Sequence, residues 1–310
     1  MPAELHWFYL LFAGVLGALI GSFLNVVILR LPRKIAWTWR KDALEWLADR
    51  PEPNLGLADD EVLRQAATEG LARHTQSQIP PGIVVKGSHC PHCQTPIRWY
   101  DNLPIAGWLA LRGKCRACKV AISPQYPLVE TIAAGLAVAA VATFGWTPAA
   151  LAACVFLGLL LTLAVIDART MYLPDDLVLP GIWLALAWSL AAQTWWPGQA
   201  ISPEQALLGA ILGYGGLAAV ARGYGALTGR EGMGGGDLKL LGLIGAFLGP
   251  GALIPVIGLS AIGGAVLGIL LRWRRGESRP FPFGPWLALA AAAWCLVGQP
   301  LGWESQLLGR

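Results

Sequence analysis

The chain has 310 residues, of which 55% are hydrophobic and only 14% are charged. A soluble domain carries roughly 25% charged residues, so this composition excludes an ordinary soluble enzyme and predicts a polytopic membrane protein. The net charge is only +4, and the basic residues adjoin apolar runs instead of forming a patch of their own. We therefore expect no nucleic-acid partner, and the lipid bilayer as the environment.

The first apolar run extends from Trp7 to Leu29 and is long enough to span a bilayer. No Lys or Arg precedes it, whereas a basic cluster that begins at Arg30 follows it. This is a stop-transfer pattern with the N-terminus outside the cytoplasm, and it argues against a cleaved signal peptide. Asn25, near the inner end of the run, is either a polar contact between helices or part of a site.

A long polar loop covers residues 30–123 on the basic, cytoplasmic side. In its first half Leu63, Ala67 and Leu71 recur every four residues, which predicts an amphipathic helix. The segment 38–85 carries no catalytic signal, so we expect a solvated or membrane-lying flap there.

The second half of the loop contains two cysteine pairs, CPHC and CRAC. Two such pairs supply four thiolates to one tetrahedral ion, whereas disulfides are disfavoured because thiols on the cytoplasmic side stay reduced. A closed four-thiolate set leaves no open coordination position, so we expect a structural zinc ion. The predicted ligands are Cys90, Cys93, Cys115 and Cys118, with His89 and His92 as substitutes.

Seven further apolar runs give about eight transmembrane helices in all and an all-α membrane fold. They cover residues 126–144, 149–166, 177–194, 205–222, 238–249, 251–271 and 283–297. Alternate connections between the runs lack Lys and Arg, and by the positive-inside rule this asymmetry places both termini in the periplasm. The run 238–249 is too short to cross the hydrocarbon alone, so we expect it to lie among other helices.

Three consecutive glycines, Gly234, Gly235 and Gly236, precede Asp237 at the start of this short run. Glycine admits positive φ angles and leaves room for another chain, so we expect a slot for an extended substrate beside the acid. A carboxylate at the edge of an apolar segment is a candidate functional group. The alternative is that Asp237 only caps the helix that enters the membrane.

A second acid, Asp167, lies in the last apolar turn of the third span. The predicted topology places Asp167 and Asp237 on the same side of the membrane and at similar depth. Two carboxyl groups held close together share a proton, so one can activate water while the other protonates the leaving group. Asp175 and Asp176 compete for this role, but they begin a helix, where capping is natural. Asp167 ends a helix, where the dipole disfavours an anion, and this misplacement favours a catalytic role.

Three further charged residues are weaker candidates. Lys239 and Arg169 lie close to the acids in the sequence, where they either balance charge or snorkel to lipid headgroups. Glu130, just inside the second span, either pairs with an arginine or a substrate amine, or serves as an N-terminal helix charge. Lys239 and Glu130 join the three glycines as substrate-binding candidates.

Together these motifs resemble the bacterial type IV prepilin peptidases, which belong to the GxGD class of intramembrane aspartyl proteases. The shared segments are GSFLNVVILRLP at 21–32, the four cysteines, YPLVE at 126–130, Asp167 with the downstream LPD, EGMGGGDLKLLGLIGAFLG at 231–249 and PFGPWLAL at 282–289. The resemblance implies that Asp167 and Asp237 are catalytic and that Gly234 and Gly236 are the signature glycines. Gly235 departs from the pattern, since relatives often carry His or Tyr there, and residues 38–85 match poorly.

The resemblance also implies a function at the bacterial inner membrane. The family cleaves the leader of prepilins and pseudopilins after a glycine at the cytoplasmic face. Many members also methylate the new N-terminal residue with S-adenosyl-L-methionine. On this interpretation residues 1–29 form the first transmembrane helix, 30–123 the cytoplasmic loop and 124–310 the protease core. Methyl transfer rests on the resemblance alone, because the loop is too short for a separate Rossmann domain.

Two other classes of function compete with this interpretation. A transporter also uses intramembrane acids, but it predicts acids near the midplane and repeats of broken helices, neither of which the sequence contains. A scaffold that docks a pilus or secretion ATPase through the zinc loop would tolerate loss of both acids. We therefore predict an aspartic endopeptidase with N-methyltransferase as a second activity.

Overall fold

The computed structural model describes residues 3–49, 60–76, 79–80, 82–83, 87–198, 200–229, 234–275 and 281–298. Within these ranges the chain is helical, with two isolated β-bridges and no strand, so the predicted all-α class is confirmed. The chain divides into two compact units. One is Val26–Ile97, and the other combines Met1–Asn25 with Arg98–Arg310.

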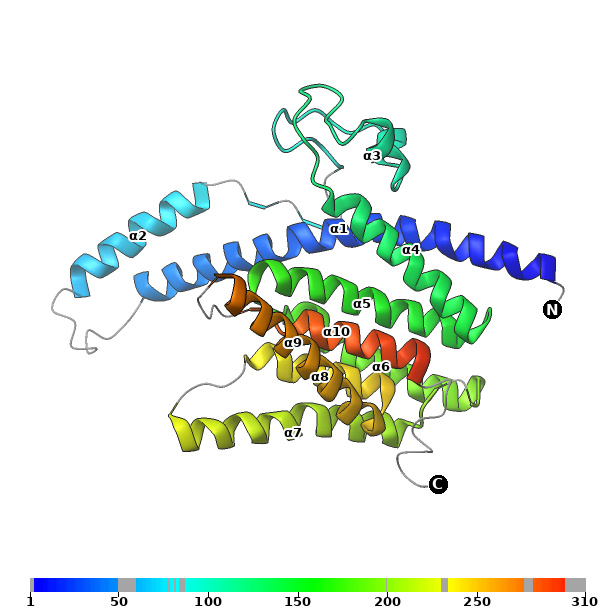
Figure 1. Cartoon of the computed structure of the whole chain (residues 1–310). Coiled ribbons are helices and arrows are strands. Elements are labelled where there is room, and N and C mark those ends of the chain that lie inside the picture. The colour runs from blue at the N-terminus through cyan, green and yellow to red at the C-terminus, as the bar shows by residue number, and fades with distance from the viewer. Residues whose placement is uncertain are drawn as a thin grey trace. The chain divides into compact units, whose positions relative to one another are not determined.

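The apolar segments predicted from the sequence are all helical in the part of the chain that is described (Figure 1). These helices are α1 (Ala3–Ala48), α4 (Gln125–Phe144), α5 (Pro148–Thr170), α6 (Asp175–Trp195), α7 (Pro203–Thr228), α8 (Gly235–Leu248), α9 (Leu253–Arg275) and α10 (Gly284–Ala293), which continues as a π-helical turn, η3 (Trp294–Gly298). Six of them are long and apolar enough to cross a membrane, whereas α8 and α10 with η3 are shorter. The polar regions contribute α2 (Asp60–Gln76), α3 (Ala106–Ala110) and the 3-10 turns η1 (Trp99–Asn102) and η2 (Pro250–Ala252).

The first helix does not end near Leu29 but continues through Pro32 to Ala48. Proline removes one backbone hydrogen bond, but good helix formers follow it, and a Lys41–Glu45 ion pair of 3.1 Å spans one turn. The boundary expected between the first span and the polar loop therefore falls inside a helix.

The core of the larger unit is formed by α5, α8 and α10. Its fully buried side chains include Phe156, Leu157 and Leu163 on α5, Leu240, Leu243 and Ile244 on α8, and Leu287 and Ala291 on α10. The short helix α8 is buried from Leu240 to Ala246 and at Leu248, and it packs against α6, α7, α9 and α10. The expectation that this segment lies among other helices is thus confirmed. Neighbouring helices surround its buried part, which is why that part carries apolar side chains on all faces.

Glycines bring α7 and α8 into direct backbone contact. A methyl group added at Gly209 would lie 2.0 Å from the carbonyl oxygen of Gly245, and one added at Gly213 would lie 2.5 Å from that of Leu241. Such an approach is open only to helices with small residues at the crossing. The two helices therefore pack in one fixed register, which holds the N-terminal end of α8 in place.

The outward faces of the long helices remain apolar. Large exposed side chains include Trp183 on α6, Leu208 and Ile211 on α7, and Ile254, Ile262 and Ile269 on α9. Soluble proteins rarely expose contiguous apolar surface of this kind, whereas lipid requires it. The structure is that of a multi-pass membrane protein.

The smaller unit packs α2 against the C-terminal half of α1. His74 Nε2 donates to the carbonyl oxygen of Trp37 at 3.0 Å, and the two rings stack with centroids 4.8 Å apart. The helix predicted around Leu63, Ala67 and Leu71 is α2, so that prediction is confirmed.

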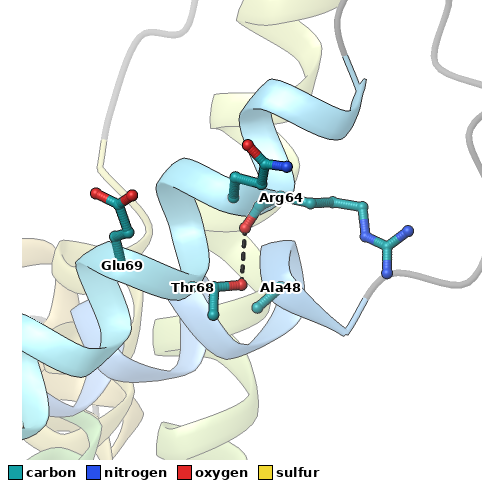
Figure 2. A pocket seen from close by; sticks show the side chains of 5 residues that line it. Ala48, Arg64, Thr68 and Glu69 are labelled. Carbon is teal, nitrogen blue, oxygen red and sulfur yellow. Dashed lines mark hydrogen bonds between the residues drawn. The ribbon is translucent and has the colours of Figure 1, made fainter.

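A polar hollow of about 300 Å³ lies in the smaller unit (Figure 2). It is lined by Ala48, Arg64, Gln65, Thr68 and Glu69. The hydroxyl of Thr68 donates back to the carbonyl oxygen of Arg64 in its own helix at 2.8 Å. The hollow lies in the region where the sequence carries no catalytic signal, and we assign it no function.

Candidate active site and metal site

Asp167 lies in the last turn of α5, where the helix is closed by a left-handed residue. Met171 adopts φ 52°, and its N–H donates to the carbonyl oxygen of Asp167 at 2.8 Å. The Asp167 side chain turns inward and is only 5% exposed. A carboxyl group buried to this extent requires polar partners, and one is found on a distant helix.

That partner is the backbone N–H of Gly284, the first residue of α10. It donates to Oδ2 of Asp167 at 3.0 Å, across 117 positions of sequence. No local pattern predicts this contact, since PFGPWLAL carried only a resemblance to the family. Gly284 is therefore the residue of the site that sequence reasoning missed.

Asp237 lies in the first turn of α8. The N-cap residue of this helix is Gly234, and no side-chain hydrogen bond caps it. Asp237 therefore does not cap α8 through its side chain, which was the alternative role considered for it. Its carboxyl group lies close enough to Asp167 for the two charges to interact. The end of α5 and the beginning of α8 therefore bring these two acids together.

The glycines before Asp237 provide space rather than an unusual backbone conformation. Gly234 has φ −69°, and neither Gly235 nor Gly236 is among the residues with positive φ, so this segment does not use the positive φ angles that glycine permits. A methyl group added at Gly235 would meet no atom within 4 Å, whereas one at Gly236 would lie 3.1 Å from Leu173. Open space therefore exists beside Gly235.

The cations near the acids in the sequence are bound by other partners. Lys239 Nζ lies 2.8 Å from both carboxylate oxygens of Asp175 and so joins α8 to α6. Arg169 donates to the side-chain oxygen of Gln125. In the described residues, neither cation forms an ion pair with Asp167 or Asp237.

Glu130 is buried in α4, past its first turn, and holds the polar loop. Its Oε2 accepts the N–H of Ile105 at 2.7 Å, and the Ser22 side chain is a second hydrogen-bond partner. Ile105 has φ 59°, a left-handed angle that a β-branched residue rarely adopts. An arginine was one partner expected for Glu130, but in the structure its carboxylate accepts the backbone amide of Ile105 instead.

The two cysteine pairs fold as similar turns. In the first, the N–H of Cys90 donates to Thr95 O at 2.9 Å, and the N–H of Gln94 donates to Cys90 O at 2.9 Å. In the second, the N–H of Cys115 donates to Val120 O at 2.8 Å, and the N–H of Lys119 donates to Cys115 O at 3.1 Å. Gln94 and Lys119 both have positive φ, 57° and 59°. The repeated geometry aims both thiols of each pair to the same side.

All four thiols converge. Their Sγ atoms lie within 4.8 Å of one another, and all six cysteines of the chain are free thiols. A tetrahedral zinc ion with Zn–S bonds of about 2.3 Å separates its sulfur ligands by about 3.8 Å. The donor set and its spacing thus fit a four-thiolate metal ion after a small contraction.

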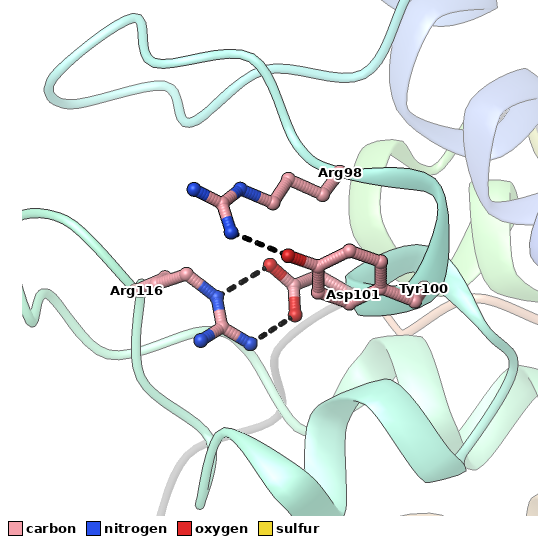
Figure 3. A network of polar contacts seen from close by, with 4 residues as sticks. All are labelled: Arg98, Tyr100, Asp101 and Arg116. Carbon is pink, nitrogen blue, oxygen red and sulfur yellow. Dashed lines mark hydrogen bonds and ion pairs between the residues drawn. The ribbon is translucent and has the colours of Figure 1, made fainter.

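A polar network stiffens the second cysteine turn (Figure 3). Arg116, between the two cysteines, forms a bidentate pair with Asp101 of η1, with Nε–Oδ2 and Nη2–Oδ1 distances of 2.8 and 2.6 Å. Arg98 donates to the hydroxyl of Tyr100. The hydrogen bond from Arg116 lowers the pKa of Asp101, so the pair stays charged at neutral pH.

The helices and the acids together define a multi-pass helical membrane protein with two carboxyl groups, at the end of α5 and the beginning of α8, that are close enough for their charges to interact. Comparison with known proteins adds the family. Residues 15–144 match the Bacterial Peptidase A24 N-terminal domain, and residues 154–269 match the Type IV leader peptidase family. The chain belongs to the type IV leader peptidase family, so the resemblance drawn from its motifs is confirmed.

Similar proteins span almost the whole chain. One from Xanthomonas campestris pv. campestris is 42% identical over 282 residues, covering 90% of this chain and 88% of the relative. One from Stutzerimonas stutzeri is 42% identical, covering 94% and 92%, and one from Pseudomonas aeruginosa is 41% identical, covering 89% and 86%. Each is named Prepilin leader peptidase/N-methyltransferase. No solved structure matches the chain.

Proposed function

We propose that this protein removes the leader of prepilins and pseudopilins after a glycine and then methylates the new N-terminal residue. The observation that carries the first activity is that Asp167 and Asp237 lie close enough for their charges to interact, while a methyl group added at Gly235, two residues before Asp237, would meet no atom within 4 Å. Family membership and the names of the relatives support both activities.

The proposed cleavage follows from the carboxyl pair. Two neighbouring carboxyl groups hold one proton between them, so one is a base while the other is an acid. The base takes a proton from water as the water oxygen attacks the scissile carbonyl carbon. The acid gives its proton to the departing amine nitrogen as the carbon–nitrogen bond breaks. The segment Gly234–Gly236 would admit the extended backbone of the substrate, since a carbonyl must reach both acids at once.

The proposed metal is a structural zinc ion held by Cys90, Cys93, Cys115 and Cys118. The convergence of four thiols supports a soft tetrahedral ion. When bound, zinc would join the two cysteine turns and would leave no open position for a reactant. We propose S-adenosyl-L-methionine as the methyl donor, and its binding residues are not assigned.

The proposed location is the bacterial inner membrane, with the acids facing the cytoplasm and both termini in the periplasm. The charge asymmetry of the connections supports this orientation. A prepilin would then keep its hydrophobic segment among lipid and helices while its leader lies in the cytoplasm.

The test of this function is cleavage of a synthetic prepilin by purified protein in liposomes, read by intact mass with and without S-adenosyl-L-methionine. We expect a product without its leader in both samples and a product one methyl group heavier when the donor is present. Cleavage without methylation would leave a peptidase only. An uncleaved substrate in every sample would favour the transporter or the scaffold.

The zinc site has its own test. Elemental analysis of the purified protein should give about one zinc per chain, and Cys115→Ser with Cys118→Ser should abolish it. Ala substitution of Cys154, which lies outside the cluster, should leave the zinc content unchanged. A metal-free wild-type chain with four reduced thiols would contradict the assignment.

A further inference from the structure

We infer that Gly284 is a positioning residue for the carboxyl pair, through its backbone N–H and through its lack of a side chain. The inference rests on the proposed peptidase function. It concerns a residue on α10, remote in sequence from both acids.

The first turn of α10 leaves one backbone donor for Asp167. The first N–H groups of a helix have no partner within it. Pro285 has no N–H, and the N–H groups of Trp286 and Leu287 both donate to Phe283 O, at 3.0 and 3.2 Å. Gly284 N–H is therefore the donor that remains in this turn, and it is bonded to Asp167.

This contact resolves the apparent misplacement of Asp167. The carboxyl group lies at the C-terminal end of its own helix, where the dipole opposes an anion, but also at the N-terminal end of α10, where the dipole favours one. No side chain of α10 caps this helix, so Asp167 supplies the cap from another helix. One interaction thus closes α10 and fixes the acid.

Gly284 also has to be glycine for reasons of space. A methyl group added there would lie 2.7 Å from Oδ2 and 3.1 Å from Cγ of Asp167. The residue does not have a positive φ, so its backbone conformation is open to other residues. The absence of a side chain is what allows the carboxyl group to reach the N–H.

The segment that carries Gly284 is itself held rigidly against α9. The ring of Trp286 occupies the space over Gly263, where an added methyl group would lie 2.4 Å from it. A methyl group added at Gly264 would lie 3.4 Å from the ring of Phe283, and one added at Gly268 would lie 3.5 Å from the ring of Phe281, both ordinary contact distances. Packing of three aromatic rings on a glycine face fixes the donor, and the donor then fixes one oxygen of Asp167. In the described residues the other oxygen, Oδ1, has no hydrogen-bond partner, which leaves it for water or for Asp237.

The test replaces Gly284 with glycolic acid, which changes its N–H to an ester oxygen and adds no side chain. We expect kcat for prepilin cleavage to fall about 10- to 100-fold with KM nearly unchanged, because a hydrogen bond to a charged group is lost, and the thermal midpoint to fall by no more than about 10 °C. The pH profile of kcat should change as well, since the donor acts on one member of a titrating pair. Gly284→Ala should lose activity more completely because it displaces the acid.

The matched control is the same ester at Gly258 in the second turn of α9, where an added methyl group would meet no atom within 4 Å. It loses one ordinary helix hydrogen bond and should keep the wild-type kcat. Wild-type kcat and pH profile in the Gly284 ester would overturn the inference, while loss of cleavage in Asp167→Asn in the same assay would leave the peptidase function standing. A wild-type enzyme that does not cleave would overturn both.

Discussion

At the residue scale, the acids of the site are distinguished by what surrounds them. The nearby cations interact with other residues: Lys239 forms an ion pair with Asp175, and Arg169 donates a hydrogen bond to Gln125. Asp167 accepts a hydrogen bond from a backbone N–H, and Asp237 lies close enough to Asp167 for the two charges to interact. A carboxyl pair without a bonded cation is the arrangement that shares a proton, which is the property that acid–base cleavage of a peptide requires.

Glu130 gives a prediction at the same scale. Glu130→Ala should remove the acceptor of the half-buried N–H of Ile105, which should cost about 1 kcal/mol of local stability. Hydrogen exchange should therefore quicken at Ile105 and its neighbours in the loop. Glu130→Gln keeps an acceptor oxygen and should show a smaller effect. Unchanged exchange in the Ala variant, with a raised KM, would assign Glu130 to the substrate instead.

At the element scale, the position of Asp237 depends on how α8 is held. The helix is buried from Leu240 to Ala246. Its N-terminal turn is joined to α6 by Lys239, and it has little free space at Gly236, where an added methyl group would lie 3.1 Å from Leu173. Helix packing thus decides where the second acid lies.

The α7–α8 crossing predicts unequal effects of equivalent glycine substitutions. Gly209→Ala should destabilise the protein by about 1–3 kcal/mol or more, because the new methyl group meets the backbone of Gly245. Gly216→Ala lies on the same helix, where an added methyl group meets no atom within 4 Å, and should be neutral. Thermal unfolding in one detergent compares them. Equal midpoints for the two variants would contradict the crossing.

The ion pair between α6 and α8 predicts a charge-swap rescue. Both side chains are partly exposed, so the pair should add no more than about 1 kcal/mol to stability. Lys239→Ala and Asp175→Ala should each lower kcat up to about tenfold by shifting the turn that carries Asp237. The double exchange Lys239→Asp with Asp175→Lys should recover much of it. Failure of the exchange to recover activity would point to direct substrate contact by Lys239.

At the scale of the whole molecule, hydropathy predicted the helices. In lipid the backbone N–H and C=O groups of an apolar run must hydrogen-bond to one another, and a helix does this within one segment. It also predicted that the short segment 238–249 lies among other helices. It did not predict that α1 continues through Pro32 to Ala48. Pro32 removes only one backbone hydrogen bond, and the helix-forming residues that follow it outweigh this loss.

The site was predictable only in part, for a physical reason. The acids, the glycines and the cysteine pairs are local patterns with characteristic spacing. The bond from Gly284 to Asp167 and that from Ile105 to Glu130 join backbone amides to distant side chains, and a backbone amide leaves no mark in a sequence. The same holds for Lys239, whose partner was visible only once α6 and α8 were placed together.

The most direct test of the carboxyl pair compares single Asp→Asn substitutions at positions 167, 237 and 176. Initial rates of leader removal should be measured by intact mass, with a thermal midpoint for each variant. Asp167→Asn and Asp237→Asn should each lose at least about a thousandfold in rate while remaining folded. Asp176→Asn, an exposed acid in the first turn of α6, should retain the wild-type rate. Near wild-type cleavage by either of the first two variants would contradict the catalytic pair.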